Sequence, residues 1–84
     1  MTLEQAIEVA DNYFNFDYLG DAMMDVRREL DNTELREELV ETLTDIMCEN
    51  EGDDERELFA EAAKARVEQF VESAKSTKGK GCGK

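Results

Sequence analysis

Rows of acidic residues are the feature of this sequence with the clearest capacity to act on another molecule. The members of two such rows, here called the acidic ladders, are Asp17, Asp21, Asp25 and Glu29, followed by Glu34, Glu38, Glu41, Asp45 and Glu49. The first row recurs every four residues, and the second does nearly the same. On a helix, residues four apart are neighbours about 6 Å apart, and like charges at that spacing are mildly destabilising. Each ladder therefore predicts a line of carboxylates that attracts basic protein surfaces.

The chain as a whole is acidic, and its charge is unevenly distributed. It has 84 residues with 22 Asp and Glu, 10 Lys and Arg and no His, which gives a formal net charge of −12. All the acids lie in residues 1–74 with six basic residues, whereas residues 75–84 carry four lysines and no acid. Such a body repels nucleic acid and anionic membranes. An acidic helical surface also serves solubility alone, and the sequence leaves that alternative open.

Catalytic chemistry finds little support in these residues. Without His, the chain lacks the side chain that titrates near neutral pH, and Cys48 and Cys82 lack the imidazole base that a thiol nucleophile uses. Fitting the invariant EF-hand glycine to Gly52 puts Leu58 at the last ligand position, so the acidic segment 49–57 is not such a loop. We predict a protein that is not an enzyme and uses no cofactor or specific metal. Cation sensing at 49–57 is the weakest alternative.

Apolar residues at intervals of three and four predict the helices that must hold the ladders. Thr2 and Gln5 form a capping-box pattern before the first helix, and a second helix runs from about residue 15 to 30. Gly20 lies near the start of the second helix and costs about 1 kcal/mol relative to Ala if it is helical, so this turn is the weakest. The two apolar stripes are Leu3, Ala6, Ile7, Ala10 and Phe14, then Phe16, Leu19, Met23, Val26 and Leu30.

The second half of the chain predicts two more helices. Asn32 or Thr33 caps the third, Gly52 ends it in a left-handed conformation, and Asp54 with Glu57 forms a capping box for the fourth. Their apolar stripes are Leu35, Leu39, Val40, Leu43, Ile46 and Met47, then Leu58, Phe59, Ala62, Ala63, Val67, Phe70, Val71 and Ala74. We predict an all-α fold, a small bundle of about four amphipathic helices. It forms one acidic domain over 1–75, followed by a disordered, flexible basic tail over 76–84.

Four of the six aromatic residues surround the bend between the first two helices. The periodicity places Phe14 and Phe16 in the core beside this bend. Tyr13 and Tyr18 fall at the edges of the stripes, where a tyrosine buries its ring and keeps its hydroxyl in water, and tyrosine is common in binding hot spots. Met24 falls outside the apolar seam. We therefore include Tyr13, Tyr18 and Met24 among the predicted contact residues.

The sequence also predicts the setting in which the protein works. The N-terminal residues are acidic where a signal peptide is basic, and no apolar run is long enough to span a membrane. We expect a cytoplasmic protein, in the host cytoplasm if the chain is viral, with no membrane association. Two cysteines favour free thiols over a Cys48–Cys82 bridge, which stays an alternative. Domains of this size often gain from oligomerisation, so a homodimer is also left open.

A small, acidic, helical chain without catalytic groups resembles phage-encoded inhibitors of host nucleases, including anti-restriction and anti-CRISPR proteins. The resemblance is one of composition and covers no motif, so it transfers no residue roles. We predict an inhibitor that mimics DNA: it does not bind nucleic acid directly, but occupies a basic nucleic-acid-binding groove on a partner protein, most simply a nucleic-acid-binding enzyme. The predicted ladder contacts are Asp17, Asp21, Asp25, Glu29, Glu34, Glu38, Glu41 and Asp45. The alternative is a structural or adaptor subunit that docks or dimerises through an apolar helix face at Tyr13, Tyr18 and Met24.

Overall fold

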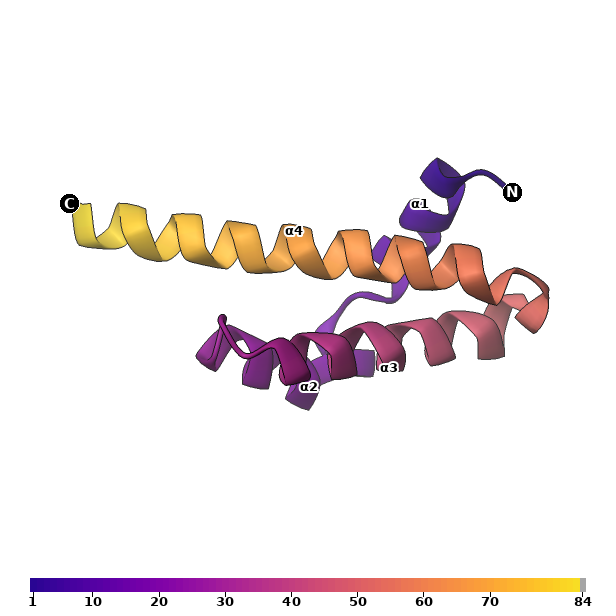
Figure 1. Ribbon diagram of the computed structural model, residues 1–84, viewed down its shortest axis with the longest axis horizontal. Coiled ribbons are helices and arrows are strands. Elements are labelled where there is room, and N and C mark those ends of the chain that lie inside the picture. Colours follow the sequence, from indigo (N-terminus) through magenta and orange to yellow (C-terminus); the bar gives the residue numbers. More distant parts are fainter. Residues whose placement is uncertain (84) are drawn as a thin grey trace.

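Over residues 1–83, the chain folds into four α-helices (Figure 1). The elements in chain order are α1 Leu3–Tyr13, α2 Phe16–Arg28, α3 Thr33–Glu51, the 3₁₀ turn η1 Asp53–Glu55, and α4 Arg56–Gly83. The computed structural model describes the backbone of residues 1–83 and the side chains of residues 1–76. Over that backbone there is no strand. The predicted all-α bundle of about four helices is therefore confirmed.

The two long helices, α3 and α4, lie antiparallel along the long axis of the molecule (Figure 1). The short connection through Gly52 and η1 brings α4 back along α3. The other two helices pack on different members of this pair: α1 mainly on α4, and α2 mainly on α3. In Figure 1, α1 crosses behind α4 and α2 lies behind α3. Although α1 and α2 are consecutive in the chain, they thus pack on different members of the long helix pair.

One apolar core lies between the four helices, and each helix contributes to it. Its buried members are Ala6 and Ala10 of α1 with Phe14 at the C-cap of that helix; Leu19, Met23 and Val26 of α2; Leu39, Leu43, Met47 and Cys48 of α3; and Phe59, Ala62, Ala63, Val67 and Val71 of α4. Nearly all of them lie on the predicted stripes, because only one side of each amphipathic helix can face its neighbours. Burial of these side chains is the main favourable term in folding.

Side-chain caps fix where the first and third helices start. The Thr2 hydroxyl accepts from the Gln5 amide at 3.2 Å, and the Gln5 side chain accepts from the Thr2 amide at 2.9 Å, so the predicted capping box is confirmed. Asn32 rather than Thr33 caps α3, because the Asn32 side chain accepts from the Leu35 amide at 3.2 Å.

The start of α2 is irregular. Asn15 caps it in an extended conformation, and Leu19 then departs from helical geometry with φ −126° and ψ 16°, next to Gly20. This kink explains one wrong prediction. Phe16 was expected in the core on the stripe of Leu19, but it is 56% exposed. Because the kink lies between Phe16 and the buried Met23, helical periodicity does not carry from one to the other.

Three further predictions need correction. Leu3 was placed on the α1 stripe but is exposed, since it is the first residue of the helix and no helical turn precedes it. The expected capping box of Asp54 and Glu57 is replaced by η1, whose start has no side-chain cap. Gly52 has the expected positive φ, but at φ 112° and ψ 153° it lies outside the left-handed helical region, in one that only glycine readily adopts.

Helix α4 extends beyond the predicted domain boundary. The backbone of α4 continues to Gly83, whereas the sequence predicts that the regular pattern ends near Ser76. Side chains 77–84 lie outside the described part of the structure. The flexible basic tail over 76–84 and the domain boundary before it therefore stay predictions.

Candidate protein-binding surface

The ladder on α3 lies on the outer side of that helix. Its five members, Glu34, Glu38, Glu41, Asp45 and Glu49, are all exposed. The opposite side of α3 carries Leu39, Leu43 and Met47, which are fully buried. The core residues and the acids follow the same helical period with different phase, so packing of α3 into the bundle turns the whole row of carboxylates outward.

The ladder on α2 is exposed at three of its four positions. Asp17, Asp21 and Glu29 are exposed, and Asp25 is half-buried. Asp17 occupies the first turn of α2, where a carboxylate is favoured by the positive end of the helix dipole. Because α2 packs on α3, the two ladders belong to adjacent helices.

Few positive groups compensate these ladders. The Arg56 guanidinium lies 2.8 Å from Asp45, and this hydrogen-bonded pairing raises the pKa of Arg56 above its usual value. Asp25 is 3.7 Å from Arg28 one turn later on the same helix. Glu29 accepts from the Asn32 side chain at 3.3 Å, a bond to a neutral group. The other ladder carboxylates, at Asp17, Asp21, Glu34, Glu38, Glu41 and Glu49, have no ion-pair partner among the side chains of residues 1–76.

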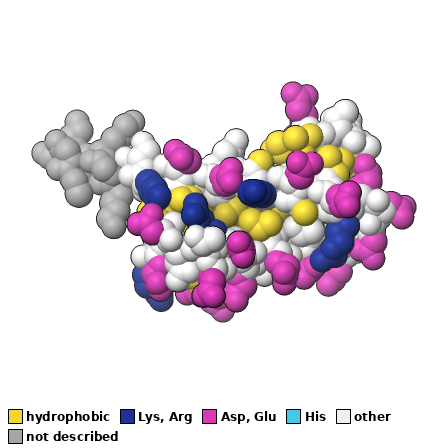
Figure 2. Space-filling view, in the orientation of Figure 1, with side chains coloured by type: hydrophobic (Ala, Val, Ile, Leu, Met, Phe, Trp, Pro, Cys, Tyr) yellow, Lys and Arg dark blue, Asp and Glu magenta, His cyan; other side chains and the backbone are white. Residues whose placement is uncertain are grey.

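The space-filling view agrees with this scarcity of positive partners. In Figure 2, Asp and Glu side chains crowd the lower edge of the molecule, along α3 and the helix behind it. The Lys and Arg side chains on this face lie mostly in the band between α3 and α4. A shallow groove there is lined by Arg36, Arg56 and Lys64, with Val40 and Val67 among its apolar residues. The positive groups on this face thus lie mainly beside one edge of the α3 ladder, where Arg56 pairs with Asp45.

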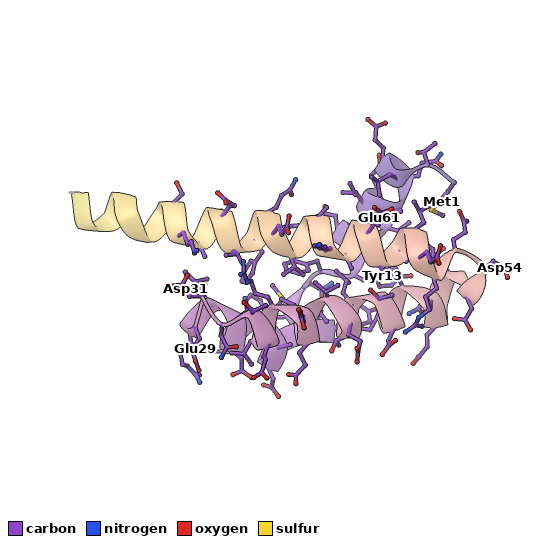
Figure 3. All side chains as sticks on the ribbon, in the orientation of Figure 1. Met1, Tyr13, Glu29, Asp31, Asp54 and Glu61 are labelled. Atoms are coloured by element: carbon purple, nitrogen blue, oxygen red, sulfur yellow. The ribbon has the colours of Figure 1, made fainter. Side chains whose placement is uncertain are left out.

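The predicted tyrosine contacts lie where α1, α2 and α3 meet. Tyr13 is labelled in Figure 3. Its hydroxyl donates to Glu51 Oε2 at 2.9 Å, and this bond to a carboxylate raises the pKa of Tyr13. Tyr13 is half-buried, and its ring meets that of Tyr18 edge to face at 5.5 Å. Tyr18 is 52% exposed. The Tyr13 hydroxyl is therefore engaged in a hydrogen bond within the fold, whereas Tyr18 is exposed and available to contact a partner.

Met24 is part of a second surface feature of α2 that the sequence prediction missed in part. Phe16, Met24, Arg27 and Arg28 line one shallow concavity, here called the α2 patch. Phe16 and Met24 are 56% and 55% exposed. The signal in the sequence was the spacing of four between Met24 and Arg28, which sets them beside the core stripe, whereas Phe16 reaches the same concavity across the kink at Leu19 and had no such signal. Met24 was predicted as a contact residue, but Phe16 and the arginines were not.

The remaining chemically reactive groups are few. Cys48 is a free thiol buried against the core, and burial raises its pKa although the nearby Arg56 acts in the opposite direction. Within the described side chains, no three Cys, Asp or Glu residues converge as a metal ion would require, including those of segment 49–57. Cys82 and any bridge to it lie outside the described side chains. None of the helices in the described part of the chain is long and apolar enough to cross a membrane.

Comparison of this chain with protein-family models, with curated proteins and with solved structures gave no match. What the protein binds must therefore be argued from its own surface.

Proposed function

We propose that this is a non-enzymatic protein that binds a basic surface of another protein through the acidic ladders of α2 and α3. In its specific form, the proposal is an inhibitor of phage type acting in the cytoplasm. It occupies the nucleic-acid-binding groove of a host nuclease or of another DNA- or RNA-binding protein. The observation that carries the proposal is the outward row of exposed carboxylates on α3, most of them without a positive partner among the side chains of residues 1–76.

The retained charge repulsion is the physical reason to assign a role to the ladders. Like charges four apart on a helix destabilise it by about 0.2–0.5 kcal/mol per pair, and a typical surface relieves this by interspersing Lys and Arg. Here the described ion pairs relieve only Asp45 and Asp25. A basic partner would supply the missing counter-charges, and the same field would steer that partner during association.

The spacing of the carboxylates supports a nucleic-acid-binding groove as the target. Four helical residues advance about 6 Å. Successive phosphates of one strand advance about 3.4 Å along the helix axis, and further along the twisted backbone. A groove whose Lys and Arg residues follow a phosphate backbone can therefore contact successive carboxylates of a ladder. The two adjacent helices widen this surface beyond a single row.

Charge reversal on the ladders tests the proposal directly. The ladder variant combines Asp21→Lys, Glu34→Lys, Glu38→Lys and Glu41→Lys, all at exposed positions with no described ion pair. A matched control combines Glu57→Lys, Glu61→Lys, Glu68→Lys and Glu72→Lys on α4, which are also exposed. Both variants change the net charge equally, so only the position of the charge differs. Circular dichroism checks that each variant keeps its helicity.

The readout is capture of nucleic-acid-binding proteins from a bacterial lysate on the immobilised chain. We expect the wild type and the α4 control to retain a protein that competitor duplex DNA displaces at unchanged ionic strength, and the ladder variant to lose it. Equal retention by the ladder variant and the wild type would contradict the proposal. So would retention that neither DNA nor high salt disturbs.

A second candidate function is an adaptor that docks through an apolar helix face. The observation in its favour is that Tyr18 and Met24 each expose more than half of their surface. Binding of this kind depends little on salt, because exposed charges contribute little to it. Retention that survives high salt and the ladder variant, but is lost with Tyr18→Ala and Met24→Ala, would favour the adaptor.

A further inference from the structure

The α2 patch is chemically different from the rest of the surface. It joins two half-exposed apolar side chains, Phe16 and Met24, to two arginines in the last turn of the same helix. Arg28 keeps 69% of its side chain exposed, and its one described ion pair, to Asp25, is 3.7 Å long. Apolar side chains with adjacent free cations form a binding surface for an apolar, acidic partner.

The charges along α2 are segregated by position. Asp17 and Asp21 lie in its first half, whereas the second half carries Asp25 together with Arg27 and Arg28, so that the first half is net negative and the second half net positive. When two such helices pack in the same direction, acid meets acid and arginine meets arginine. When they pack in opposite directions, the acidic half of each faces the basic end of the other. The patch is therefore complementary to a second copy of itself, in the antiparallel sense only.

We propose that the α2 patch is the interface of a two-fold symmetric homodimer, in which the α2 helices of two copies pack antiparallel. This surface shares Asp17 with the ladders proposed above, whereas Phe16, Met24, Arg27 and Arg28 lie outside them. With the symmetry axis level with Ala22, Asp17 of one copy lies beside Arg27 and Arg28 of the other. Phe16 of each copy lies against the same guanidinium groups, which favour aromatic faces. A two-fold interface of this kind repeats every such contact twice.

At this interface, Gly20 of one copy leaves room for the Met24 side chain of the other. In the antiparallel register, Met24 of one copy is opposite Gly20 of the other. A Cβ built on Gly20 meets no atom within 4 Å, so the space over this residue is open. An unbranched Met side chain adapts readily to such a shallow recess. The apolar centre of the interface would then be Met24 over Gly20, with Phe16 and the arginines on either side.

Size and charge determine how tight this dimer can be. α2 has 13 residues and is about 20 Å long, so a single helix pair gives an interface at the small end of the specific range. Each copy also carries a formal net charge of −12, which opposes association. Salt screens that long-range repulsion, with a Debye length of about 10 Å at 0.1 M, more than it weakens groups in contact. The dimer should therefore strengthen from low to moderate salt, whereas ladder binding to a basic partner weakens.

Sedimentation equilibrium on the full chain tests the proposal, at about 10 μM to 1 mM protein and about 0.15 M salt, where small transient interfaces dissociate. We expect the wild type to show a reversible monomer–dimer equilibrium. Met24→Lys should raise the dissociation constant by more than about tenfold. The position is exposed, so the fold is retained, and circular dichroism checks this. Glu61→Lys, an exposed change on α4, is the control and should leave the equilibrium unchanged or slightly stronger.

A charge-exchange experiment tests the antiparallel geometry. Asp17→Arg alone, and the double variant Arg27→Glu with Arg28→Glu, each place like charges together at both ends of the homodimer, so each variant should be mainly monomeric. Mixed in equal amounts, the two variants restore an opposite pair at both ends, and dimers should reappear. A monomeric wild type over the whole concentration range overturns the dimer. A dimer unaffected by Met24→Lys, or variants that stay monomeric on mixing, overturns this interface. None of these results bears on DNA-displaceable capture by the ladders.

Discussion

The two short helices are consecutive in the chain but are held in different ways. At the end of α1, the ring of Phe14 packs edge to face with Phe70 of α4 at 5.3 Å, and the Arg66 guanidinium lies 4.6 Å from the centre of the Phe14 ring. Arg66 also donates to Asp11 at 2.9 Å. The buried side chains of α2 are aliphatic only, and its aromatic and basic residues remain at the surface; the buried set is Leu19, Met23 and Val26.

This difference separates stability from recognition. At the end of α1, Phe14 and Asp11 make their contacts within the fold, where packing gives an aromatic ring its largest effect. The same residue types on α2 are exposed and are left for intermolecular contacts. Substitutions at matched residues of the two helices should therefore act on different properties: stability at α1, and association at α2.

The largest expected contrast is between the two phenylalanines of the bend. Phe14→Ala should lower the free energy of unfolding by about 3 kcal/mol, because it removes a buried ring and leaves a cavity beside Phe70. Phe16→Ala should change it by less than about 0.5 kcal/mol, because the ring is more than half exposed. Urea denaturation of both variants at low protein concentration measures the difference. Similar losses for both would mean that α2 is as strongly held as α1.

The contrast between Phe14 and Phe16 also marks the limit of what sequence could predict. Helical spacing predicted four helices, both confirmed caps and almost all of the buried core, because one period relates every residue of an uninterrupted helix. Phe16 was placed wrongly because the non-helical Leu19 breaks that period. Similarly, Asp54 and Glu57 have the spacing of a capping box, but Asp54 lies within the 3₁₀ turn after Gly52.

For the candidate surface, sequence predicted exposure but not pairing. The outward direction of the α3 ladder follows from the period alone. The period does not predict which ladder carboxylate is neutralised, because the pair of Asp45 and Arg56 joins residues of different helices that only the turn at Gly52 brings together. Of the α2 patch, only Met24 was predicted from the sequence. The contact roles themselves stay predictions.

A smaller, stabilising effect is expected at the weak start of α2. Gly20→Ala should raise the free energy of unfolding by about 0.5 kcal/mol, because Gly20 has no positive φ, its added Cβ meets no atom within 4 Å, and alanine restricts the unfolded chain. Gly52→Ala is the matched control. It should be destabilising, since φ 112° strains any residue with a Cβ. Thermal unfolding at a concentration where the wild type is monomeric compares them. A loss at Gly20 would indicate that the kink at Leu19 needs glycine.

The smallest expected effect is at Tyr13, which connects the two regions by contacting both Tyr18 and Glu51. The hydrogen bond to the Glu51 carboxylate raises the pKa of Tyr13 above 10.0, because it favours the neutral phenol. A raised pKa on an acid means that the folded state holds the proton more tightly. The stabilisation is therefore fully present below about pH 10 and is lost as pH rises through the folded pKa.

Tyr13→Phe removes this bond and the titration together. The variant should be slightly less stable than the wild type at about pH 8 and should lose that disadvantage at higher pH, where the wild-type phenolate faces a carboxylate. Tyr18→Phe is the control, because the Tyr18 hydroxyl has no described hydrogen bond to another side chain, and its difference from the wild type should not follow this course. Urea denaturation at several pH values measures both differences. A Tyr13→Phe difference that is constant with pH would mean that the Tyr13–Glu51 bond does not hold α1 to the end of α3 in solution.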